Sequence, residues 1–315
     1  MVWFCFTMTC LRKSFLFGAP FLVSALHAAI NITGYDPLVN DRFANDPSFI
    51  ISSSDPAVLS GVAIADTGLN GFVGDDGGRW VTMVSRNVFI TAEHFSPPNG
   101  SSVTFYQSND PLGGQVTRSI QSSQRIGTSD LRIGVLDTPL PIGYNSYNFV
   151  TEDITSLADF NNPAVNPYRF DVAALFGRSP TAYTDLSQEM SVGLNRLDGW
   201  VDSITAAGST DAGLLAGVDD SGDALFVSSE ALLQLGDSGA PVMVIVGGEL
   251  TIVGINWFIA TGGEQDINGF SYVGNYDTEI QNYIDANPVP ELSCFALLAG
   301  LYAGAGPFVR RRRRI

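Results

Sequence analysis

Residues 236–241 read Gly-Asp-Ser-Gly-Ala-Pro, and the apolar run Val-Met-Val-Ile-Val follows directly at 242–246. Gly, Asp and Ser favour tight turns, and a Val-rich run bounded by such residues predicts a β-strand. The glycines Gly236 and Gly239 permit the backbone of a tight loop, which would hold Ser238 just before that strand. Taken alone, the same residues would also suit an ordinary turn.

A histidine stands at the end of a second predicted strand. Residues 91–94, Thr-Ala-Glu-His, follow the run Asn-Val-Phe-Ile at 87–90, and His94 is the only histidine after residue 29. A neutral imidazole is the commonest base in catalysis, which makes His94 a candidate for that role. The alternative is a structural histidine in the core.

An acid begins a third β-run, Ser-Asp-Leu-Arg-Ile-Gly-Val-Leu at 129–136. Asp130 is therefore the candidate partner for His94. Two other acids are alternatives: Asp110 in a turn-like stretch, and Asp137 at the far end of the same run. The alternative for Asp130 itself is that it is only a turn residue at the start of the strand.

These motifs, in the order His, Asp, Ser, resemble those of the chymotrypsin/trypsin family of serine endopeptidases. The family's Thr-Ala-Ala-His, Asp-Ile-Ala-Leu-Leu and Gly-Asp-Ser-Gly-Gly-Pro have close counterparts here. Subtilisin-like and α/β-hydrolase triads follow a different chain order. The resemblance covers roughly residues 58–285. It implies an all-β fold of two six-stranded antiparallel β-barrels, about 58–160 and 168–285, with a short C-terminal helix.

The chemistry explains why these residue types are needed. A serine hydroxyl attacks a carbonyl only when an adjacent base removes its proton, and His94 would serve as that base for Ser238. Asp130, buried beside the other ring nitrogen, would fix the tautomer and stabilise the imidazolium. The backbone N–H groups of Gly236 and Ser238 would form the oxyanion hole, which is worth roughly 3 kcal/mol per donor.

Three residues depart from the family pattern around His94 and Ser238. Phe95 replaces a common cysteine, so the disulfide that closes this loop in the family is absent. Glu93 replaces an alanine, and its carboxylate would raise the pKa of His94 if it faced the ring. Ala240 replaces a glycine, which is a small change.

The family's activation signal is also incomplete. In the family, the Asp before the serine pairs with an N-terminus that is released by cleavage. Asp237 is present here, but no Ile-Val-Gly-Gly start is found, and the nearest stretch is Ser-Gly-Val-Ala at 60–63. Activation by propeptide removal is thus not supported by the sequence.

The resemblance also implies a substrate pocket. Leu232 and Leu233 fall near its base, and Trp257 and Gly269 lie on the strands that line it, with Phe258 as an alternative wall to Trp257. No acid stands at the base to bind Lys or Arg, so an apolar or aromatic preference is expected instead of trypsin-like cleavage. The alternative is that the leucines pack in the core.

The rest of the chain between its two ends, residues 30–285, which we call the body, agrees with an all-β domain. Short runs of β-branched and aromatic residues recur between clusters of Gly, Asn, Asp and Ser, which is typical of sandwiches and barrels. The stretch 161–167, with Asn-Pro twice, is a plausible linker between halves. Residues 276–284 suit a short closing helix. Residues 30–57 show no clear pattern and are expected to be an exposed lead-in or a propeptide-like segment.

Both ends look like sorting signals. Residues 1–29 carry Arg12 and Lys13, an apolar run and small residues for cleavage, as in a secretory signal peptide. Residues 286–315 combine Pro-Glu-Leu, a short apolar stretch and five arginines, which resembles a bacterial PEP-CTERM tail although Leu292 replaces its second proline. The implied partners are the export machinery and an exosortase. The alternative is an ordinary C-terminal membrane anchor.

Charge and composition exclude several classes of function. Residues 30–293 hold 9 arginines, no lysine and 32 acids, a net charge of 9 − 32 = −23, which repels nucleic acid and anionic membranes. The three cysteines, at positions 5, 10 and 294, lie in the two ends, so no disulfide or thiol serves the body. A single histidine excludes a multi-histidine metal site, and no cofactor motif is present. Asp219 to Asp223 resembles only part of a calcium loop, and a solvated turn is the alternative.

The sequence therefore predicts an exported serine endopeptidase that hydrolyses peptide bonds through an acyl-enzyme on Ser238. We expect it to be secreted or associated with the cell envelope, touching the membrane only through its C-terminal tail. A catalytically silent relative that binds proteins or polymers is the first alternative. A serine esterase that uses the same triad is the second, because the acyl-transfer chemistry is shared.

Overall fold

The computed structural model describes residues 29–51, 53–68 and 77–289. The predicted signal peptide and most of the predicted tail lie outside these residues. Within them, no helix is both long and apolar enough to span a membrane.

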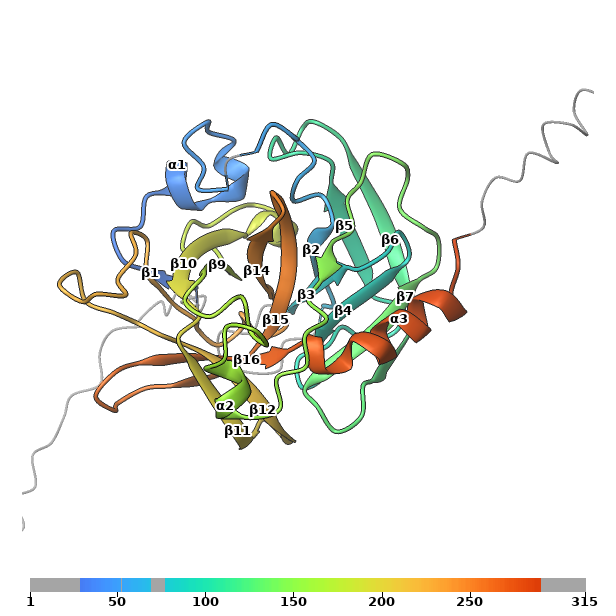
Figure 1. Ribbon diagram of the computed structural model, residues 1–315. Helices are drawn as coiled ribbons and strands as arrows, with labels where there is room; N and C mark the ends of the chain where they lie inside the picture. The colour runs from blue at the N-terminus through green and yellow to red at the C-terminus, as the bar shows by residue number, and fades with distance from the viewer. Residues whose placement is uncertain (1–28, 52, 69–76, 290–315) are drawn as a thin grey trace, which may run out of the picture.

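A closed six-stranded antiparallel barrel forms the first half of the body (Figure 1). Its strands pair in the order β2-β3-β4-β7-β6-β5, and pairing of Ala65 with Val103 closes the ring between β2 and β5. Gly134 faces the ring of Phe89 so closely that a Cβ there would stand 2.4 Å from it, so glycine is required for Phe89 to fill the barrel. The strands are β2 Val62–Asp66, β3 Gly78–Met83, β4 Val88–Ala92, β5 Ser102–Tyr106, β6 Gln115–Arg125 and β7 Leu131–Leu136.

The second half is an eight-stranded sheet with the path β10-β9-β14-β15-β16-β12-β11, and β8 pairs in parallel with β15. The expected second six-stranded barrel is therefore replaced by a sheet whose end strands are not hydrogen-bonded to each other. Side chains link β10 to β12 instead: Asn195 donates from its amide to the carbonyl of Gly217, at 3.1 Å. The strands are β8 Asn148–Phe149, β9 Val172–Gly177, β10 Ser191–Arg196, β11 Gly199–Ala206, β12 Ser209–Gly217, β14 Pro241–Val246, β15 Glu249–Ala260 and β16 Ile267–Tyr272.

Helices are few and short, so the predicted all-β class is confirmed. The C-terminal helix lies against the first barrel although it follows the last strand of the second half (Figure 1), and Asn87 holds its end by donating to the carbonyl of Asn287, at 2.9 Å. The stretch 161–167 has no regular structure. The helical elements are α1 Pro37–Asn40, α2 Leu157–Phe160, α3 Asp277–Ala286 and the 3-10 helices η1 Arg42–Ala44, η2 Leu186–Gln188 and η3 Gly274–Tyr276.

The first part of the lead-in is anchored by buried side chains, which corrects the expectation that residues 30–57 form an exposed segment. Its strand β1 Asn31–Ile32 pairs with β13 Ala231–Leu232, and Ile30, Ile32 and Phe43 are buried. Ile30 and Ile32 have the two-residue spacing of a strand, but the run is too short to predict one, so tertiary packing is what reveals their role. The segment is part of the large core cluster that both halves share.

Arg42 ties the lead-in to the first barrel. It is fully buried, and its guanidinium donates to the carbonyls of Val62 at 3.1 Å, Tyr106 at 3.0 Å and Ser108 at 3.3 Å. Burial lowers the pKa of Arg42 to about 10, because a buried charge without a nearby anion is less stable than one in water. The three carbonyls supply the hydrogen bonds that keep this charge tolerable.

Candidate active site

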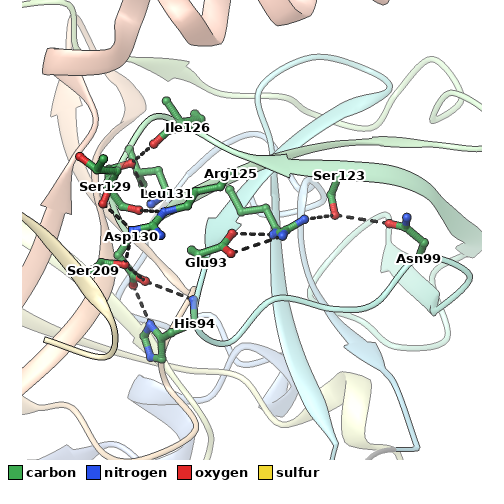
Figure 2. Close-up of polar contacts among 12 residues, drawn as sticks. Glu93, His94, Asn99, Ser123, Arg125, Ile126, Ser129, Asp130, Leu131 and Ser209 are labelled. Atoms are coloured by element: carbon green, nitrogen blue, oxygen red, sulfur yellow. Dashed lines mark hydrogen bonds and ion pairs between the residues drawn. The ribbon is translucent and has the colours of Figure 1, made fainter.

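The register of one strand pair brings His94 and Asp130 together. Strand β4 pairs with β7 so that Ala92 faces Leu131, and the next position continues the pairing, with the N–H of Glu93 donating to the carbonyl of Asp130 at 2.8 Å. The backbone N–H of His94 then donates to Oδ1 of Asp130 at 3.1 Å. Its ring Nδ1 lies 2.7 Å from Oδ2 of the same carboxylate (Figure 2).

This geometry prepares His94 to act as a base. Asp130 is fully buried, whereas the side chain of His94 is 20% exposed. A carboxylate at Nδ1 favours the tautomer with the proton on Nδ1, so Nε2 keeps its lone pair. The same carboxylate would stabilise the imidazolium after His94 accepts a proton.

A residue from the second half completes the surroundings of Asp130. Ser209, at the start of β12, donates from Oγ to Oδ1 of Asp130 at 3.2 Å, and it is itself buried (Figure 2). The sequence reasoning missed Ser209, because it follows an Ala-Gly hairpin turn that belongs to no motif. Only the fold shows that this hairpin reaches Asp130.

The turn that carries Ser238 lies against the first barrel. Gly239 has a φ of +89°, and a Cβ on it would stand 2.6 Å from Oγ1 of Thr91, three residues before His94. The indole Nε1 of Trp80 donates to the carbonyl of Gly236 at 3.2 Å. The contact with Thr91 places the turn beside the end of β4, which leads to His94, and the bond from Trp80 ties it to β3.

The hydroxyl and the predicted oxyanion donors of this turn are free. Within residues 29–51, 53–68 and 77–289, the Ser238 hydroxyl makes no hydrogen bond, and the N–H groups of Gly236 and Ser238 have no acceptor. Gly236 has a φ of 101°, a conformation that glycine adopts readily. The turn can therefore offer one hydroxyl and two N–H donors to a bound molecule.

Asp237 is buried beside Ser238 and is satisfied by backbone amides. Its Oδ1 accepts from the N–H of Arg178 at 2.6 Å and its Oδ2 from the N–H of Gln234 at 2.8 Å. Burial raises the pKa of Asp237 to about 7, against the lowering effect of these two hydrogen bonds. The stretch 60–63 lies elsewhere: Ser60 is fully buried and the stretch runs into β2.

The two substitutions beside His94 each have a partner of their own. The guanidinium carbon of Arg79 lies 3.7 Å from the centre of the Phe95 ring, a cation–π contact that links β3 to the loop after His94. Glu93, which Figure 2 labels, pairs with Nε of Arg132 at 2.7 Å. The Glu93 carboxylate is thus engaged by a cation, which counters the effect on His94 that the sequence suggested.

The predicted pocket residues meet with different environments. Leu233 is buried and donates its N–H to Oδ1 of Asn268 at 2.8 Å, and Trp257 is buried with its Nε1 donating to the carbonyl of Ala206 at 3.2 Å. Leu232 is half-buried in β13, where it pairs with Asn31. Leu233 packs in the core cluster, as the alternative interpretation held.

The half-exposed ring of Phe258 covers Gly269. These two residues pair between β15 and β16, and a Cβ on Gly269 would stand 2.2 Å from the Phe258 ring. Only a glycine fits beneath this ring. Phe258 is therefore the aromatic wall at Gly269, whereas Trp257 points into the interior.

Residues 219–223 form a turn whose acidic side chains accept hydrogen bonds from the turn itself and from Gln265. The N–H of Asp220 donates to Oδ2 of Asp223 at 2.9 Å, and the Gln265 amide donates to Oδ1 of Asp219 at 2.8 Å. In the part of the chain that the structure describes, no group of three or more His, Cys, Asp or Glu side chains could hold a metal ion.

Comparisons with known proteins identify the fold. No family model matches the chain, and no curated protein matches it. Among solved structures, a variant of human heparin binding protein is 15% identical with a TM-score of 0.50, covering 76% of this chain and 96% of its own. The MamO protease domain of Magnetospirillum magneticum is 16% identical with a TM-score of 0.45, covering 71% and 97%. A scabies mite inactivated protease paralogue is 14% identical with a TM-score of 0.49, covering 74% and 95%.

Heparin binding protein, the neighbour with a TM-score of 0.50, has a chymotrypsin-like serine protease fold. The predicted chymotrypsin-like fold class is thereby confirmed, although the second half is one large sheet and not a second closed barrel. At 15% identity, the likeness to heparin binding protein establishes the fold alone.

Proposed function

We propose that this chain is a serine endopeptidase in which Ser238 attacks the peptide carbonyl and His94 accepts its proton. The observation that carries the proposal is the pairing of His94 Nδ1 with the buried carboxylate of Asp130 at 2.7 Å, next to a turn with a free serine hydroxyl. A buried carboxylate that orients a partly exposed imidazole has a clear catalytic use. The chymotrypsin-like fold supports the same reaction class.

The reaction would run in two balanced steps. Ser238 Oγ bonds to the carbonyl carbon while its proton moves to His94 Nε2, and the N–H groups of Gly236 and Ser238 would stabilise the oxyanion. His94 then gives the proton to the leaving amine, which leaves an acyl-enzyme. Water, deprotonated by His94, attacks the acyl carbon, and the proton returns to Ser238 as the acid departs.

Two other functions are the alternatives to a serine endopeptidase: a silent binding protein and a serine esterase. A silent binding protein would keep the fold without a working site, but a complete His94–Asp130 pair beside a free serine is not needed for binding alone. Heparin binding protein is named for a polyanion, and the net charge of −23 over residues 30–293 opposes binding of a polyanion here. A serine esterase would use the same residues, so substrates must separate it from a peptidase.

Export and sorting belong to the proposal through the two ends of the chain. A signal peptide at residues 1–29 and a tail at 286–315 would deliver the body to the cell envelope. The substrate would be a protein or peptide there, with an apolar side chain favoured by the Phe258 wall.

Hydrolysis of a peptide library tests this function. The full chain and Ser238→Ala are incubated with unstructured peptides and with matched ester substrates, and products are identified by mass spectrometry. Ser221→Ala, a change in an exposed turn, is the control. Cleavage of peptides by the native and Ser221→Ala proteins, but not by Ser238→Ala, supports the peptidase. Cleavage of esters alone would favour the esterase, and no turnover of either would favour the silent binder.

A further inference from the structure

Asp130 is contacted from behind by a short chain of hydrogen bonds that ends on a cation. Ser209 Oγ donates to Oδ1 of Asp130 at 3.2 Å, and Nη2 of Arg125 donates to the same Ser209 Oγ at 2.8 Å. A hydroxyl has a single proton, and because Arg125 can only donate, Ser209 must direct that proton to the carboxylate. The orientation of the Ser209 hydroxyl is thus fixed by Arg125.

Arg125 is itself held in place by the turn between β6 and β7. Its Nε donates to the carbonyl of Ser129 at 2.7 Å, and its Nη2 also contacts the carbonyl of Thr128. The guanidinium is therefore anchored one residue away from Asp130 along the chain. It comes from the first barrel, whereas Ser209 comes from the second half (Figure 2).

The other charged groups around this chain are few. Asp211 lies behind Ser209 and accepts from the hydroxyl of Tyr276 at 2.7 Å, and burial is the main cause of its raised pKa. Arg125 lowers that pKa and Asp130 raises it, so all three charges act on one another.

Glu93, the neighbour of His94 in the chain, forms an ion pair with Arg132 at 2.7 Å. Arg79 lies over Phe95, the next residue along the chain. Among the residues that the structure describes, Arg125 is the one cation linked to the Asp130 carboxylate through a single intervening side chain, that of Ser209.

We propose that Arg125 is a positioning residue that acts through Ser209 to orient the Asp130 carboxylate toward the ring of His94. This inference rests on the proposed function, since it assigns a role in preparing His94 as a base. It also makes the site depend on contact between the halves, because the hairpin of β11 and β12 must be docked for Ser209 to join Arg125 to Asp130.

The physical consequence is a shift in the pKa of His94. A cation two hydrogen bonds from the carboxylate opposes protonation of the imidazole, so its removal makes the ring more basic. Loss of the Arg125 charge should raise the pKa of His94 by about 0.5 to 1 unit, given the partial exposure of Arg125. Loss of the Ser209 hydroxyl should also raise it, because Asp130 then interacts more strongly with the imidazolium.

The test measures the pKa of His94 directly, without substrate. Full-length chain carrying His27→Gln has His94 as its only histidine, so its ring signals can be followed by NMR against pH. Arg125→Met, Arg125→Lys and Ser209→Ala are compared in this background. We expect upward shifts in Arg125→Met and Ser209→Ala, and a pKa close to the native value in Arg125→Lys.

Arg118→Met is the matched control. Arg118 lies on the same strand β6 and also donates to backbone carbonyls, those of Pro139 and Thr117, but it has no bond to the Asp130 network. It should leave the pKa of His94 unchanged. Shifts of equal size in Arg118→Met and Arg125→Met would overturn the proposal, as would an unchanged pKa in Arg125→Met. A shift in Arg125→Met without one in Ser209→Ala would remove Ser209 from the account.

Folding and catalysis are separated by the same variants. Arg125→Lys keeps the charge and tests the site even if Arg125→Met does not fold. The proposed function would be contradicted, and this inference left intact, if the variants showed the expected shifts in the pKa of His94 while a serine-reactive probe failed to label Ser238 in the native protein. Normal labelling with no pKa shift would do the reverse.

Discussion

In the first barrel, His94 and Asp130 stand one or two positions beyond the paired ends of β4 and β7, so the ladder register brings them together. In the second half, Ser238 lies on a turn whose place depends on contacts with Trp80 and Thr91 from the other half. The first arrangement is local to a strand pair, and the second requires the two halves to meet. Changes in the first half should therefore affect chemistry with little effect on folding, whereas changes at the turn should affect both.

The largest expected effect is the loss of catalysis when the His94–Asp130 pair at the ends of β4 and β7 is changed. Asp130→Asn keeps the shape of the buried side chain but can leave Nδ1 of His94 facing an amide, which favours the wrong tautomer. We expect kcat to fall about 10⁴-fold. Thermal unfolding should change little in comparison, and a loss of activity that simply follows loss of fold would contradict the local picture.

Asp237, in the turn that carries Ser238, should make the stability of the fold depend on pH. Its pKa is raised to about 7 in the folded protein from an ordinary 3.8, so folding favours the protonated form. The stability from this group is present in full below about pH 4 and is lost as pH rises toward 7, by about 4 kcal/mol at most. Urea unfolding of native protein and Asp237→Asn from pH 4 to 8 measures the difference.

Between pH 4 and pH 8, the free energy of unfolding should fall less in Asp237→Asn than in the native protein. Some decline should remain, because burial also raises the pKa of Glu230 to about 7. Glu230→Gln is the matched control and should remove that second part. An identical slope in native protein and Asp237→Asn would show that Asp237 stays ionised in the fold.

Gly239 tests the contact between the halves. A methyl group there would meet Oγ1 of Thr91 at 2.6 Å and would also carry the strain of a φ of +89°. Gly262 has a φ of +83° with nothing within 4 Å, so Gly262→Ala measures the strain alone. We expect about 1 kcal/mol of destabilisation for Gly262→Ala and about 3 kcal/mol for Gly239→Ala, by denaturant unfolding. Equal losses would mean that the turn does not press on β4.

The smallest effect is expected at the contact that occupies the place of the family's disulfide. Arg79→Met, Phe95→Leu and the double variant form a cycle that isolates the cation–π contact from the other interactions of Arg79. We expect a coupling of about 1 kcal/mol, and a modest loss of activity because the loop after His94 is less well held. A coupling near zero would assign no role to this pair.

The same contrast explains what could be predicted from the sequence. His94 and Asp130 could be identified because each ends or begins a recognisable strand, and the Ser238 turn because its glycines and acid form a distinctive motif. Ser209, Arg125 and Arg79 could not, because they join the site through tertiary contacts between segments far apart in the chain. The lead-in was misjudged for a similar reason: Ile30 and Phe43 are buried by partners that no local pattern reveals.

The most direct test of the central claim is covalent labelling of the full chain with a fluorophosphonate, followed by mass spectrometric mapping of the adduct. The account predicts a single adduct on Ser238 that is lost in His94→Ala and strongly slowed in Asp130→Asn, while Ser221→Ala labels normally. Failure of the folded native protein to label, or labelling of Ser238 at an undiminished rate in His94→Ala, would contradict the claim that these three residues act as one catalytic unit.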